Sequence, residues 1–107
     1  MKSRIVFYLN IPMVEAGEVL ADQTYCFHRS IEAAYVPPMG STVHFDESFM
    51  GDIELLVTEH DYIHRFGEDA EQIACVDMVI KNLPTMTNDQ VISIFDKLEA
   101  SPEWHGV

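Results

Sequence analysis

Hydrophobic and polar residues alternate along much of the chain before residue 80, which is the pattern of half-buried β-strands. The longest alternating segment is 24–36. One of its faces is predicted to carry Tyr25, Phe27, Ile31 and Tyr35, and the other His28, Ser30 and Glu32. Because successive side chains of a strand point to opposite sides, this segment is predicted to be one long strand.

Four further segments have strand character: 3–9, 41–45, 53–66 and 71–82. An irregular stretch through Pro12 and Gly17 is expected after the first of them. Pro37 and Gly40 should end the segment 24–36, since proline removes a backbone donor and glycine permits the turn. Turns at 46–52 and 67–69 separate the last three segments, so the middle of the chain is predicted to form an antiparallel meander.

The periodicity changes near the C-terminus, where a helix is predicted. Thr87 and Gln90 have the spacing of a capping box, and Met86 and Val91 that of a hydrophobic staple. An apolar stripe follows, made of Val91, Ile94, Phe95 and Leu98. Pro102 should end the helix. We expect the stripe to cover one face of the sheet, which gives an α+β domain.

The strands arranged around the string Pro37-Pro38-Met39-Gly40-Ser41-Thr42-Val43 resemble the layout of small SH3-like barrels, in which a Pro-x-x-Gly turn often leads into a strand. The resemblance covers residues 25–80 and concerns architecture alone, because such barrels host unrelated functions. The expected fold is therefore α+β: an antiparallel β-meander or small SH3-like barrel of about five strands with one C-terminal α-helix. Residues 1–107 are expected to form a single domain.

The lengths of the apolar segments predict a soluble chain, and the cytoplasm is its expected location. None of them approaches the roughly 18 residues that a membrane helix needs. Lys2 and Arg4 before an apolar run would suit a secretory signal, but Asn10 and Pro12 interrupt that run, so a buried first strand is expected. Cys26 and Cys75 are predicted to be reduced core thiols, with a single bridge between neighbouring strands as the alternative.

Acidic residues dominate the charge of the chain. Eighteen Asp and Glu stand against six Lys and Arg, which gives a net charge of -12. Residues 46–77 contain ten acids and one base, Arg65, and so hold -9 of that total. Such a field repels phosphate and attracts cationic surfaces, so a basic protein partner is favoured and direct nucleic-acid binding is disfavoured.

Two short histidine patterns suggest chemistry but lack the geometry for it. His60 and His64 with Asp61 between them match the zinc-protease spacing, which requires a helix. On the predicted strand the two histidines would lie ~13 Å apart. A plainer metal site of His44 with His60 or His64 is an alternative. Cys26 and His28 would share a strand face at a distance near ~7 Å, too far to activate a thiol.

No catalytic residue, cofactor or metal is therefore predicted, and the acidity guides the functional hypothesis. We expect an interaction module that binds a basic protein, in the manner of immunity proteins, antitoxins or phage-encoded inhibitors of nucleic-acid enzymes. The predicted partner-binding residues are Asp46, Glu47, Asp52, Glu54, Glu59, Asp61, Glu68, Asp69 and Glu71. The alternatives are a small ligand- or metal-binding barrel or enzyme, and acidity that serves only solubility.

Two further expectations concern contacts between chains. Trp104, in the tail after the helix, is expected to pack back onto the domain, and an anchor for a partner is its alternative role. Association of identical chains is compatible with the sequence.

Overall fold

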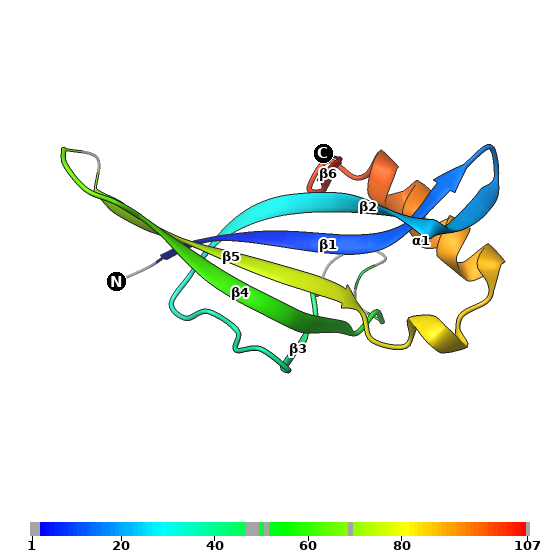
Figure 1. Ribbon diagram of the computed structural model, residues 1–107, viewed down its shortest axis with the longest axis horizontal. Coiled ribbons are helices and arrows are strands. Elements are labelled where there is room, and N and C mark those ends of the chain that lie inside the picture. The colour runs from blue at the N-terminus through cyan, green and yellow to red at the C-terminus, as the bar shows by residue number, and fades with distance from the viewer. Residues whose placement is uncertain (1–2, 47–49, 51, 69, 107) are drawn as a thin grey trace.

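The computed structural model describes residues 3–46, 50, 52–68 and 70–106. Within them the chain is a mixed α+β protein, in which six strands form one sheet curled into a half-barrel with a single C-terminal helix against it (Figure 1). The elements are β1 (Ser3–Glu15), β2 (Glu18–Ala33), β3 (Thr42–Val43), β4 (Leu55–Arg65), β5 (Glu71–Ile80), a 3-10 turn (Leu83–Thr85), α1 (Asn88–Ala100) and β6 (His105–Gly106). No helix in these ranges is long and apolar enough to cross a membrane.

The strands lie in the order β3-β4-β5-β1-β2-β6. The predicted meander is confirmed for β3, β4 and β5, which pair antiparallel as consecutive neighbours. β5 then pairs with β1 in the parallel sense, so the sheet as a whole is mixed. Alternation along a segment carries no information about which distant strand it joins, and this parallel pair was not predicted for that reason.

The first two strands form a hairpin in place of the predicted irregular stretch. Instead of an irregular stretch through Pro12, β1 continues to Glu15 and β2 begins at Glu18. Ala16 and Gly17 connect them with φ angles of 54° and 76°, the positive values that a tight two-residue hairpin turn of type I′ requires. The register shifts between Pro12 and Met13, and this irregularity accommodates a residue that cannot donate to the ladder.

The core lies between α1 and one face of the sheet, called here the inner face. Alternate residues of β1 and β5 are buried on it (Ile5, Phe7, Leu9, Ile11, Ala74, Val76, Met78, Ile80). The predicted stripe of α1 is also buried, and Phe95 meets the ring of Phe27 edge-on at 5.3 Å between centroids. The capping box is confirmed: the Gln90 N–H donates to Thr87 Oγ1, and the Thr87 N–H to Gln90 Oε1.

The tail after α1 returns to the sheet. Trp104 is 3% exposed, which confirms that it packs on its own domain. Its ring meets Phe45 edge-on at 5.4 Å, and the Arg29 guanidinium lies over both rings. The short strand β6 follows and pairs with Phe27 and His28 of β2.

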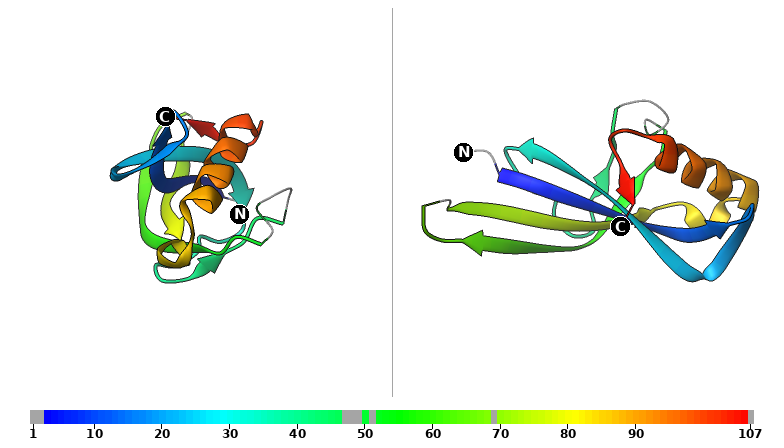
Figure 2. Two further views of the ribbon diagram at one scale, coloured as in Figure 1. Left: turned by 90° about the vertical axis from the view of Figure 1, so that its right-hand side faces the viewer. Right: turned by 90° about the horizontal axis from the view of Figure 1, so that it is seen from above.

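The β4–β5 hairpin extends away from α1 along the long axis of the molecule (Figures 1 and 2). The register of β4 shifts at Thr58, so that Val57 opposes Met78 and Glu59 opposes Asp77. Beyond this bulge His60, Tyr62 and His64 point to the inner face, opposite Val76, Ala74 and Gln72. Glu59, Asp61 and Ile63 point to the opposite, outer face.

Candidate functional site

The structure divides the predicted acidic residues into three groups along β4. Asp46, Asp52 and Glu54 precede the strand, Glu59 and Asp61 lie on it, and Glu68 and Glu71 lie at the hairpin tip. Glu47 and Asp69 fall outside the described residues. Because β4 has 11 residues, the first and last groups are about 35 Å apart by strand rise. The structure therefore places Glu59 and Asp61, called here the middle group, close together, and it places the acids before β4 far from those at the hairpin tip.

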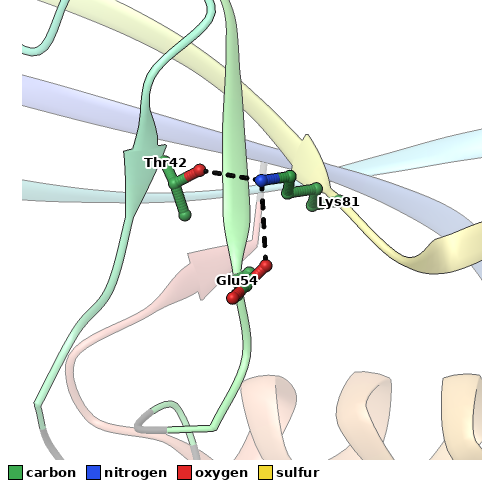
Figure 3. A network of polar contacts seen from close by, with 3 residues as sticks. All are labelled: Thr42, Glu54 and Lys81. Atoms are coloured by element: carbon green, nitrogen blue, oxygen red, sulfur yellow. Dashed lines mark hydrogen bonds and ion pairs between the residues drawn. The ribbon is translucent and has the colours of Figure 1, made fainter.

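Two acids outside the middle group contact a basic residue of the same chain. Lys81 Nζ lies 3.9 Å from Glu54 Oε2 and donates to Thr42 Oγ1 at 3.2 Å (Figure 3). Arg65 and Glu71 approach to 4.0 Å across the hairpin. Exposed pairs of this kind contribute little to stability, but each reduces the negative charge that a partner would meet.

The middle group concentrates negative charge on the outer face of neighbouring strands. Glu59 lies directly opposite Asp77 of β5, and Asp61 lies opposite Cys75. Desolvation raises the pKa of the Asp77 carboxyl, and the nearby charge of Glu59 raises it further. Like charges that face one another across a sheet destabilise the fold, so this arrangement reduces its stability.

The two cysteines are free and lie on strands that flank β1, so the alternative of a bridge between neighbouring strands is wrong. The predicted core position is also wrong, because both side chains are half-buried on the outer face. Burial raises the pKa of both thiols, and negative charge from Asp77 adds to the effect at each. Tyr8 lies on β1 between them, and desolvation likewise raises its pKa. A thiol that resists ionisation is a poor nucleophile, which argues against catalysis at Cys26 and His28.

The histidines of the zinc-protease pattern lie on a strand, where the metal geometry of that pattern cannot form. His60 and His64 flank Tyr62 on the inner face, with ring centroids 5.8 and 6.2 Å from the tyrosine ring. Phe66 continues the row, 6.5 Å from His64. In the described residues no group of three or more His, Cys, Asp or Glu side chains could hold a metal ion.

A hollow of about 410 Å³ opens on the inner face beyond the reach of α1. Its walls include Ile5, Phe7 and Ile31 of the sheet, with Tyr35 from the segment between β2 and β3 and His44 directly after β3. Tyr35 was predicted to lie in a strand of residues 24–36, but β2 ends at Ala33 and the tyrosine is 76% exposed. Alternation could not reveal this hollow, because its walls come from distant segments.

Sequence reasoning counted Asp77 in the acidic segment but left it out of the predicted site. The signal was present, since alternation in 71–82 places Asp77 and Cys75 on the same face. Tyr8 lies beside Asp77 only because β1 pairs with β5, and the sequence does not reveal that pairing.

No family model, curated protein sequence or solved structure matches the chain.

Proposed function

We propose that the protein is an acidic interaction module that binds a basic protein partner through Glu59, Asp61 and Asp77. The observation that carries this proposal is the Glu59–Asp77 pair, two carboxylates directly opposite one another with Asp61 next to them on the same face. An arginine or lysine placed between the carboxylates would relieve their repulsion. A bound cation would therefore supply the positive charge that these carboxylates lack in the isolated protein.

The remaining acids act at longer range in this proposal. Asp46, Asp52, Glu54, Glu68 and Glu71 surround the middle group at both ends of β4, and Glu47 and Asp69 belong to the same segments. Together they extend the negative field and raise the rate of encounter with a cationic surface. This long-range contribution should decrease with ionic strength, because charges are screened beyond ~8 Å in physiological salt.

The proposed class of partner follows from the similarity between clustered carboxylates and the phosphates of nucleic acids. A basic surface that binds nucleic-acid phosphates also accepts carboxylates, so the proposed partner is a nucleic-acid-binding protein whose binding surface this chain occupies.

The proposed location is the cytoplasm, where thiols stay reduced, because the half-buried cysteines are free. The SH3-like assignment of the half-barrel stays a prediction, and the parallel β1–β5 pair is a feature that it must accommodate.

Binding of a short labelled peptide of alternating arginine and serine tests the proposal. Fluorescence anisotropy should show binding that weakens steeply as NaCl is raised. The double variant Glu59→Gln, Asp61→Asn should bind roughly tenfold more weakly, which corresponds to a loss of about 1.4 kcal/mol. Single-stranded DNA without the peptide should not bind.

The matched control removes the same charge elsewhere. Asp52→Asn, Glu68→Gln changes the net charge equally but leaves the middle group intact, and it should weaken binding less than the first double variant. Equal losses for the two double variants would mean that net charge alone attracts the peptide. That result would leave the acidity as an aid to solubility.

The hollow on the inner face supports a second candidate function, the binding of a small apolar ligand. Its walls are largely apolar, and His44 and Tyr35 supply polar groups beside them. An uncharged fluorescent dye such as Nile red should then bind the wild-type chain. Ala33→Trp should fill the hollow and abolish dye binding without affecting the arginine peptide, which separates the two candidate functions.

A further inference from the structure

Among the described residues, the edge of β4 that faces away from β5 has no strand partner over much of its length. β3 pairs only with Leu55 and Leu56. Val57 continues this contact through hydrogen bonds with Gly40 and Ser41. Because Val57 bonds to Gly40 and Ser41, the backbone groups of Met78 opposite it point away from β4, and those of Asp77, the next residue of β5, point toward β4. The same alternation continues along the hairpin beyond the bulge. The N–H and C=O groups of His60, Tyr62 and His64 therefore point away from the sheet. Such an edge is a template for another strand.

Apolar surface accompanies these backbone groups. Tyr62, Ile63 and Phe66 are 39%, 48% and 92% exposed. The Tyr62 N–H is held by Asp61 Oδ1 at 2.8 Å, a contact within the same strand that an incoming strand would replace. An exposed edge with large apolar side chains on both faces is the kind of surface that native proteins usually protect or pair.

The residues of this edge are arranged symmetrically about Tyr62. His60 and His64 lie two positions to either side of it on the inner face, and Glu59 and Arg65 lie three positions to either side on the outer face. We propose that the β4 edge pairs antiparallel with the β4 edge of a second copy of this chain, with Tyr62 on the two-fold axis. Each Glu59 then lies opposite Arg65 of the second copy, and Tyr62 lies opposite its own equivalent.

Neighbouring registers fit less well. With Asp61 on the axis, that carboxylate would face its own equivalent, and like charges directly opposite are destabilising. With Ile63 on the axis, His60 would face Phe66, which lies beyond the end of β4. Of these three registers, only the Tyr62 register avoids both a like-charge pair on the axis and a partner beyond the end of β4. Charge complementarity and the outward-pointing backbone groups therefore both favour the register with Tyr62 on the axis.

This dimer does not depend on the proposed function, and salt affects the two in opposite directions. Two chains of net charge -12 repel one another, and this repulsion outweighs two exposed ion pairs at the interface. The dimer should therefore strengthen as NaCl is raised, whereas binding of a basic partner should weaken. Asp61→Ala also separates them: it frees the Tyr62 N–H and removes a charge, so dimerisation should increase while binding of the arginine peptide decreases.

Sedimentation equilibrium tests the proposal with the wild-type chain. We expect a monomer–dimer equilibrium whose dimer fraction rises with protein concentration and with NaCl. Glu59→Arg should weaken dimerisation roughly tenfold relative to Glu99→Arg, which changes the net charge equally on the exposed side of α1. Adding Arg65→Glu to Glu59→Arg should restore the association, because the opposite charges face one another again. A simple loss of folding cannot produce that rescue.

Crosslinking locates the axis. In a background of Cys26→Ala and Cys75→Ala, Tyr62→Cys should form a disulfide-linked dimer under mild oxidation, since paired residues of adjacent strands have Cα atoms about 5.5 Å apart. Ser93→Cys, on the exposed side of α1, should remain monomeric under the same conditions. A wild-type chain that stays monomeric at high concentration and high salt, or equal crosslinking of the two cysteine variants, would overturn the proposal.

Discussion

The Asp77 carboxyl occupies a position where the fold favours its protonated form. It is half-buried on β5, it faces Glu59 across the hairpin, and desolvation followed by the charge of Glu59 raises its pKa. A carboxyl whose pKa is higher in the folded state binds its proton more tightly there than in the unfolded chain. Ionisation of Asp77 at neutral pH therefore reduces the stability of the fold.

Asp77→Asn should consequently raise the free energy of unfolding at neutral pH. The gain over wild type should shrink as the pH falls through the raised pKa, and it should vanish below the ordinary value of 3.8, where the wild-type carboxyl is protonated in both states. Urea denaturation of both proteins across this pH range measures the difference. Asp22→Asn, at an exposed position of β2, should show a smaller change. A variant less stable than wild type at neutral pH would contradict the argument.

At the scale of elements, local signals explain how well each segment was predicted. The capping box and the apolar stripe act within a few residues, so the start of α1 and its buried face could be predicted from the sequence. The ends of β1 and β2 could not, because Ala16 lacks the usual preference for a positive φ and Pro12 suggested a break. Strand pairing depends on distant contacts, which is why the parallel β1–β5 pair was missed.

Removal of the helix cap tests the contribution of one of these local signals. Thr87→Ala loses the oxygen that accepts from the Gln90 N–H, and it should reduce the free energy of unfolding by about 1 kcal/mol. Urea denaturation followed by circular dichroism measures this loss. Ser93→Ala, in the exposed middle of α1, should be neutral or slightly stabilising because alanine has the higher helix propensity. Equal losses in the two variants would show that the cap adds nothing beyond propensity.

At the scale of the whole molecule, a segment that is continuous in sequence becomes discontinuous in space. The acids of residues 46–77 are close along the chain, but Asp52 and Glu68 lie beyond opposite ends of β4, an extended strand of 11 residues in an elongated body of 47 × 26 × 24 Å. Strand direction alone therefore limits the candidate site to the middle group. Asp77 enters that group through the register of β4 with β5, which composition cannot supply.

The same charge distribution determines how salt should affect stability. The chain carries a net charge of -12, and its pairs between Lys81 and Glu54 and between Arg65 and Glu71 are exposed and long. Repulsion in the folded state is therefore larger than the attraction that these pairs provide, and unfolding relieves it by separating the charges. Raising NaCl from about 0.1 M to about 1 M shortens the screening length from ~10 Å to ~3 Å and weakens the repulsion.

The midpoint of urea denaturation should accordingly increase with NaCl, and KCl at equal concentration should give the same shift because the effect is one of ionic strength. The measurement belongs at a low protein concentration, so that salt-dependent dimerisation does not add to the stability. Reversing the charge of Glu59 and Asp61 to lysine should reduce the salt effect, since these carboxylates and Asp77 lie together on the outer face. A midpoint that falls with salt would mean that ion pairs within the chain, rather than repulsion, dominate its electrostatics.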